Sequence, residues 1–189
     1  MRVKYHTRGI VLARLHSGEA NSTIVLLTPD VGLVYARAQG VRKSGAKLAP
    51  ALGTLAENIC ILVRGKEGWR ITGAVLEDDW FSKLPSFETR SRAARISSLV
   101  ARLVVGEERD HALYPIIISF LKALATLPEE SHESIEILAA LRILTVLGLD
   151  IGEVPIDDPL FGSDLLATIQ RDRVKYIARI NNGIAASGL

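Results

Sequence analysis

The hydrophobic pattern of this 189-residue chain changes its period once, near residue 77. Before that point, short apolar runs rich in Val, Ile and Thr alternate with glycine-containing turns, as is typical of β-strands. After it, apolar residues recur at three- and four-residue spacing, as on the buried face of a helix. The pattern predicts an α+β fold in which an all-β domain, residues 1–79, precedes an all-helical domain, residues 80–189.

Five short strands are predicted in the first domain. The turns between them contain Gly18, Gly32 and Gly68, because glycine adopts a positive φ at little cost. A longer connection, residues 40–56, follows the third strand and contains a candidate short helix near 47–52. This arrangement favours a small closed barrel of the OB type, with a five-stranded meander as the alternative. The predicted strands span residues 9–16, 22–28, 33–39, 57–64 and 69–77.

Three amphipathic helices dominate the second domain. The first begins after Ser86, a candidate N-cap, and ends by Gly106. Ser131 is the candidate N-cap of the third helix, and Gly148 is its stop signal. The second and third helices are predicted over residues 112–127 and 132–147, and two weaker ones over residues 163–170 and 172–181.

The charge divides at the same place as the hydrophobic pattern. Residues 1–76 contain 11 Lys and Arg against 4 Asp and Glu, whereas residues 77–189 contain 12 against 17. The net charge of +2 therefore combines +7 in the first part with −5 in the second. We expect the two parts to have different surfaces and different partners.

Several classes of function lack the residues that they require. The single cysteine, Cys60, lies in an apolar run, which rules out an internal disulfide or a cysteine-based zinc site and favours a place in the core. The four histidines have no metal-ligand spacing, and no glycine-rich nucleotide motif or GxSxG is present. We expect no metal, no cofactor and no enzymatic activity, so an enzyme with a scattered site is the least favoured class.

Nothing in the pattern indicates export or insertion into a membrane. The longest apolar stretch, residues 113–127, is interrupted by Lys122 and is shorter than the roughly 20 residues that span a bilayer. The charged N-terminal residues are not followed by the apolar region of a secretory signal. We therefore expect a cytoplasmic protein that has no membrane partner.

A basic stretch, AQGVRKSGAKL at residues 38–48, follows the third strand. Strand alternation also places Tyr35 and Arg37 on one side of that strand. Cations that neutralise phosphates beside an aromatic ring that stacks on bases suit single-stranded nucleic acid. The alternatives are ordinary solubilising charges, and a role for the rings in the barrel core. The predicted nucleic-acid-binding residues are Arg14, Tyr35, Arg37, Arg42, Lys43, Lys47, Arg64, Lys66 and Trp69.

The order and spacing of four blocks resemble the N-terminal domain of RecO, a family of bacterial recombination and repair mediators. These blocks are GIVLAR (residues 9–14), GEAN (18–21), LLTPDVGLV (26–34) and the basic stretch at 38–48. A fifth block, EILAALRILTVLGL at residues 136–149, is similar to the helical segment of that family. The chain departs from many relatives in lacking a four-cysteine zinc module, so the resemblance implies no function of that module.

The resemblance implies a DNA-binding mediator without catalytic activity. Such a protein binds single- and double-stranded DNA, anneals complementary strands, contacts RecR and the C-terminal tail of single-strand-binding protein, and helps RecA to load. By position, basic places in the family motif correspond to Arg14, Arg42, Lys43 and Lys47.

The family's pocket for the acidic, apolar tail of single-strand-binding protein lies in the helical domain. Arg92, Arg95 and Arg102 are candidates for it, although a solvated helix face is the expected role of these residues. The rival interpretation is a protein-interaction module, in which the acidic helices dock one protein and the basic barrel meets an acidic partner without a direct DNA role.

Overall fold

The computed structural model describes residues 3–17, 21–43, 45–104, 106, 111–152, 154 and 160–188, and it divides into two compact units. The barrel unit comprises Met1–Lys83 and Val105–Tyr114, and the helical unit comprises Leu84–Val104 and Pro115–Leu189. The chain therefore passes between the units three times, whereas the sequence predicted one boundary after residue 79.

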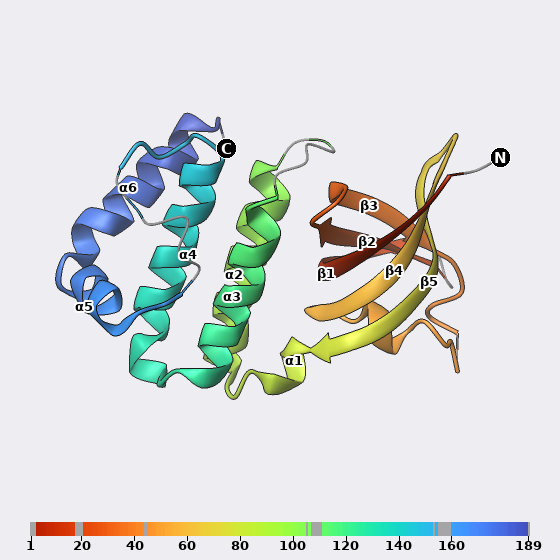
Figure 1. Cartoon of the computed structure of the whole chain (residues 1–189), viewed down its shortest axis with the longest axis horizontal. Helices are drawn as coiled ribbons and strands as arrows, with labels where there is room; N and C mark the ends of the chain where they lie inside the picture. The colour runs from red at the N-terminus through yellow and green to blue at the C-terminus, as the bar shows by residue number, and fades with distance from the viewer. Residues whose placement is uncertain are drawn as a thin grey trace. The chain divides into compact units, whose positions relative to one another are not determined.

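Five strands form the barrel unit and close in the order β1-β2-β3-β5-β4 (Figure 1, red to yellow). Neighbouring strands pair antiparallel except β3 and β5, which pair parallel over Ala36–Ala38 and Trp69–Ile71. This order confirms the OB-type barrel and excludes the meander, in which β4 would lie beside β3. The strands are β1 (Lys4–Ser17), β2 (Asn21–Thr28), β3 (Gly32–Ala38), β4 (Ala56–Gly65) and β5 (Gly68–Asp79).

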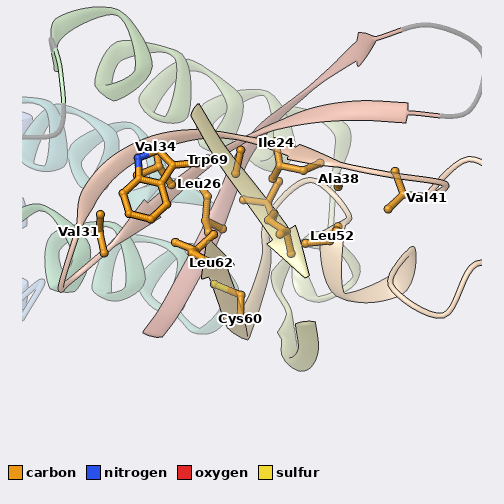
Figure 2. Close-up of a cluster of buried hydrophobic side chains, with 13 residues drawn as sticks. Ile24, Leu26, Val31, Val34, Ala38, Val41, Leu52, Cys60, Leu62 and Trp69 are labelled. Carbon is orange, nitrogen blue, oxygen red and sulfur yellow. The ribbon is translucent and has the colours of Figure 1, made fainter. Parts of the chain in front are cut away.

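Alternate side chains from all five strands fill the interior of the barrel. Figure 2 shows the indole of Trp69 among aliphatic side chains such as those of Leu26 and Val34. Trp69 lies in register with Ala36, whose small side chain leaves room for the large ring. Cys60 belongs to the same cluster, as its apolar context predicted, and burial raises the pKa of its thiol to about 12.

Apolar side chains hold the connection between β3 and β4 against the barrel. Val41 and Leu48 both pack on the core cluster. The backbone N–H of Gly40 donates a hydrogen bond to Asn21 Oδ1 at 3.1 Å, which ties the start of the connection to β2. The short helix predicted near residues 47–52 is a single 3-10 turn, η1 (Pro50–Leu52).

The carboxylate of Glu57 joins β4 to two other segments of the barrel unit. Trp80, in the short helix α1 (Trp80–Lys83), donates its Nε1–H to Glu57 Oε2 at 2.9 Å. Tyr114 donates its hydroxyl to Glu57 Oε1, also at 2.9 Å. Burial, followed by the hydrogen bond to Glu57, raises the pKa of Tyr114 well above its ordinary value. One side chain of β4 therefore holds both α1 and the end of the segment Val105–Tyr114.

The helical unit is organised around α4, which packs against α2, α5 and α6. Most residues of α4 are buried, as expected for a helix that is apolar nearly all round and lies at the centre of its unit. The helices are α2 (Phe87–Leu103), α3 (Leu113–Thr126), η2 (Glu129–Ser131), α4 (His132–Val146), α5 (Ser163–Arg171) and α6 (Arg173–Ala186) (Figure 1).

The predicted helix signals lie at the ends of α2 and α4. Ser86 Oγ accepts a hydrogen bond from the backbone N–H of Thr89 at 3.2 Å, so Ser86 caps α2. Gly148 follows α4 with a φ of +70°, which favours glycine over other residues. Ser131 is the N-cap residue of α4, as predicted, but its side chain makes no capping hydrogen bond, and the preceding turn η2 already gives it helical backbone angles. Gly18, the predicted turn glycine between β1 and β2, lies outside the described residues.

Gly183 in α6 provides a test of the packing against the end of α4. A Cβ atom at this position would lie 2.9 Å from the backbone oxygen of Leu149 and 3.1 Å from Leu144 Cδ1. Alanine normally stabilises a helix interior by about 1 kcal/mol relative to glycine, but a backbone oxygen cannot move aside cheaply. We expect Gly183→Ala to lower the free energy of unfolding by about 1–3 kcal/mol, measured by urea denaturation.

Gly162→Ala is the control, because no atom of the described residues, apart from its chain neighbours, lies within 4 Å of its added Cβ. Gly162 is the N-cap of α5, where glycine is preferred to alanine, so we expect this variant to lower the free energy of unfolding by no more than about 1 kcal/mol. A Gly183→Ala protein as stable as the unmodified chain would contradict the close approach of α6 to Leu149.

Candidate nucleic-acid interface

Strand β3 presents one aromatic and one cationic side chain on the outside of the barrel. Tyr35 is 50% exposed and Arg37 is exposed, whereas the neighbouring Ala36 and Ala38 are fully buried. This alternation agrees with the side predicted for both residues. Arg37 Nη1 lies 2.9 Å from Glu67 Oε2, in the turn between β4 and β5. An exposed ion pair of this kind contributes only about 0.2–1 kcal/mol to stability.

Strand β5 adds Arg70, a cation that the sequence analysis did not select. It lies in register with Arg37 in the parallel pairing of β3 with β5, between the buried Trp69 and Ile71, so it points outward. Its Nη2 donates a hydrogen bond to Gln39 Oε1 at 2.8 Å. Two guanidinium groups on adjacent strands therefore share one outer surface.

The predicted cations Arg42, Lys43 and Lys47 are all exposed on the connection after β3. Gly40 and Gly45, with φ of +69° and +72°, turn this connection back on itself. The backbone N–H of Lys43 donates to the Gly40 oxygen at 3.1 Å, which keeps Lys43 beside the end of β3. We call Arg37, Arg70, Arg42, Lys43 and Lys47 the basic β3 surface.

The hairpin between β4 and β5 carries two further predicted cations, Arg64 and Lys66, and both are exposed. The Arg64 guanidinium lies 5.4 Å from the centroid of the Trp69 ring, a distance at which a cation–π interaction forms. Lys66 and Glu67 are the two residues between the paired Gly65 and Gly68. Arg64 therefore covers the core, while Lys66 lies beside the carboxylate that pairs with Arg37.

Trp69 has only 5% of its surface exposed, which leaves little of the ring for a nucleic-acid base. Its neighbour Tyr5 meets it edge-on, with the ring centroids 5.2 Å apart. Of the two roles considered from the sequence, stacking on a base and packing in the barrel core, this burial fits the second. Tyr35 is the aromatic side chain of the predicted set that is available at the surface.

Arg14 does not share the surface of Arg37. It lies opposite the core residue Ile24, so its side chain starts on the inner side of β1, and β1 continues past it to Ser17. A register shift between Val11 and Ala13 causes this, because one inserted residue reverses the alternation that follows. Arg14 Nε is buried and has no hydrogen-bond partner in the described part of the chain.

The helical unit contains a groove between α2, α4 and α6, with a volume of about 620 Å³. Its apolar lining includes Ile96, Ile137 and Ile180, and its polar lining includes all three arginines considered from the sequence: Arg92, Arg95 and Arg102. The sequence did not reveal the groove, because α6 reaches it from far along the chain.

Glu136 holds two of the groove arginines. Arg92 Nη1 lies 2.6 Å from Glu136 Oε2, and Arg95 Nε lies 2.6 Å from Glu136 Oε1. The hydrogen bond to Glu136 raises the pKa of Arg95, which is a cation at any physiological pH in either case. Arg92 and Arg95 are therefore fixed by ion pairs along the groove rather than simply solvated.

Within the described ranges, no group of three His, Cys, Asp or Glu side chains could hold a metal ion. The helices of that same part of the chain are too short or too polar to cross a bilayer.

The first 76 residues, which contain most of the barrel unit, are similar to a known family. Residues 1–76 match the family described as Recombination protein O N terminal, and several of the most similar curated proteins are each named "DNA repair protein RecO". The N-terminal part of the chain is similar to the RecO family.

Coverage of the RecO relatives is partial. The protein from Dehalococcoides mccartyi is 30% identical over 120 residues, which are 64% of this chain and 47% of the relative. That from Heliobacterium modesticaldum is 28% identical over 147 residues, or 76% of this chain and 51% of the relative. The chain spans about half the length of the curated relatives it matches.

The different places of the two aromatic side chains predict different effects on stability. Trp69→Ala should lower the free energy of unfolding by about 3–5 kcal/mol, because it empties a large volume in the barrel core. Tyr35→Ala removes an outward ring and should change it by less than about 0.5 kcal/mol. Urea denaturation of both variants measures the difference, and equal effects would contradict the inward placement of Trp69.

Proposed function

We propose that this chain is a recombination and repair protein that binds single- and double-stranded DNA through its barrel unit. The observation that carries the proposal is the basic β3 surface, in which Arg37 of β3 and Arg70 of β5 lie in register and three further cations occupy the connection after β3. The net charge of +7 over residues 1–76 favours a polyanionic partner. The names of the RecO relatives, all DNA repair proteins, support the same class of partner.

The mechanism that this surface supports is electrostatic. Guanidinium and ammonium groups neutralise phosphates and release counterions, which needs no particular base sequence. The exposed ring of Tyr35, next to Arg37 on β3, offers a platform for an unstacked base. Neutralised phosphates also repel a complementary strand less, so annealing by this mechanism requires no ATP. We extend the proposal to work with RecR and to assistance in loading RecA, for which the family likeness is the support.

The loop cations provide the first test of this function. If about four phosphates are neutralised, the logarithm of the binding constant for an oligothymidine should fall against log salt with a slope near −3. Replacing Arg42, Lys43 and Lys47 together by alanine should flatten that slope by about two units, because each contact contributes about 0.7. Fluorescence anisotropy over about 50–200 mM salt measures both values.

The control for this variant is the joint replacement of Lys122, Arg171 and Lys175 by alanine, which removes the same charge from exposed positions of the helical unit. We expect that variant to keep the slope of the unmodified protein. An unchanged slope in the loop variant would remove the loop from the site. No binding at low salt would instead favour the rival interpretation, a protein-interaction module.

The groove between α2, α4 and α6 supports a second part of the proposal, a site for the C-terminal tail of single-strand-binding protein. An acidic tail with apolar residues matches an apolar floor edged by arginines. Arg102 is the cation to test, because Arg92 and Arg95 are already engaged by Glu136.

Arg102→Ala should weaken binding of a fluorescent peptide with the sequence of that tail by about 10-fold, since it removes a charge-assisted hydrogen bond. Anisotropy measures the affinity, and Arg171→Ala, on α5 and outside the lining of the groove, is the matched control. Equal affinities for the two variants would exclude Arg102 from a peptide site.

A further inference from the structure

The closure of the barrel places two like charges side by side. Arg37 and Arg70 are in register on neighbouring parallel strands and point to the same outer surface. Adjacent strands lie about 4.8 Å apart, so the side chains start close together. Like charges directly opposite one another in a sheet are destabilising unless an anion lies between or beside them. The arrangement therefore suits a negatively charged group that contacts both guanidinium groups.

In the free protein, the positive charge of Arg37 and Arg70 is only partly neutralised by neighbouring groups. Arg37 receives a full negative charge from Glu67, with Nη1 and Oε2 2.9 Å apart. Among the residues that the structure describes, Arg70 has the neutral amide oxygen of Gln39 as its side-chain partner, at 2.8 Å. The carboxylate of Glu67 thus pairs with Arg37 and not with Arg70, so the two guanidinium groups keep a net positive charge at the surface. A phosphodiester oxygen offers the same charge and acceptor geometry as the carboxylate.

Glu67 is well placed to be displaced. It lies in the two-residue turn between β4 and β5, and its side chain is 83% exposed. The Arg37 side chain is 56% exposed, so water already surrounds the ion pair and weakens it. Arg37 and Arg70 can therefore exchange their present partners for a ligand without any change in the barrel.

From this geometry we propose that Arg37 and Arg70 form one phosphate-binding site, which Glu67 occupies as an internal competitor until DNA displaces it. The proposal rests on the DNA-binding function proposed above and deepens it, because it assigns a specific site and a means of limiting affinity. When its own carboxylate occupies a site most of the time, the apparent affinity for a ligand is the intrinsic affinity multiplied by the fraction of time for which the site is vacant. Glu67 then keeps DNA binding weak enough for exchange between strands.

The test compares two glutamates that lose the same charge. Glu67→Gln should bind an oligothymidine about two- to fivefold more tightly at about 50 mM salt, with the salt slope steeper by about 0.7 for one added contact. Glu77→Gln is the control, because Glu77 also pairs with an arginine, Arg8, on the same barrel. It should change the affinity by no more than about 1.5-fold, as a distant and screened charge.

Two arginine variants connect the effect to the site. In an Arg37→Ala background, Glu67→Gln should give no more strengthening than Glu77→Gln gives, because the competitor has lost its target. Arg70→Ala alone should flatten the salt slope of the unmodified sequence by about 0.7. Thermal denaturation of each variant confirms that the barrel is folded before anisotropy is measured on the full chain.

The outcomes separate this site from the general function. If the unmodified protein binds but Glu67→Gln and Glu77→Gln behave alike, or if Glu67→Gln acts equally without Arg37, the internal competitor is overturned while DNA binding stands. If the unmodified protein does not bind DNA and the Glu67→Gln variant does, the site is supported, and Glu67 blocks it completely in the unmodified protein. If neither binds at low salt, both proposals fall.

Discussion

The short parallel pairing between β3 and β5 is the constraint on which the barrel unit depends. It joins only Ala36–Ala38 to Trp69–Ile71, yet it turns an open sheet into a closed barrel. The small side chains of Ala36 and Ala38 help this pairing to form, because the large ring of Trp69 in the neighbouring strand has to fit beside them. A bulkier residue in place of Ala36 would compete with Trp69 for the same interior volume.

The same pairing determines the outer surface. Since side chains alternate along both strands, bringing Ala36 to Trp69 on the inside necessarily brings Arg37 to Arg70 on the outside. The same strand register therefore determines both the packing of the core and the arrangement of the candidate DNA site. A slip by one residue would expose the indole and bury a guanidinium, so the apolar interior stabilises the electrostatic exterior. The connection after β3 then adds its cations next to this pair, held by Val41 and Leu48.

Local patterns were enough to predict the strands, the barrel and most helix ends, because alternation and capping depend on residues close in the chain. Three features depended on distant contacts and were not predictable. The register shift in β1 reversed the side of Arg14, burial assigned Trp69 to the core, and strand closure brought Arg70 beside Arg37. The groove lined by α2, α4 and α6 likewise requires helices far apart in sequence to meet. The sequence therefore predicted the basic region but not all of the residues that form it.

The interleaving of the two units along the chain affects how the protein can be divided. A fragment that stops at Lys83 would contain all five strands but omit Val105–Tyr114, which belongs to the barrel unit. Glu57 would then keep the indole of Trp80 and lose the phenol of Tyr114, leaving one carboxylate oxygen to be solvated by water instead. A gene fragment cut at the apparent strand–helix boundary would therefore encode an incomplete barrel unit.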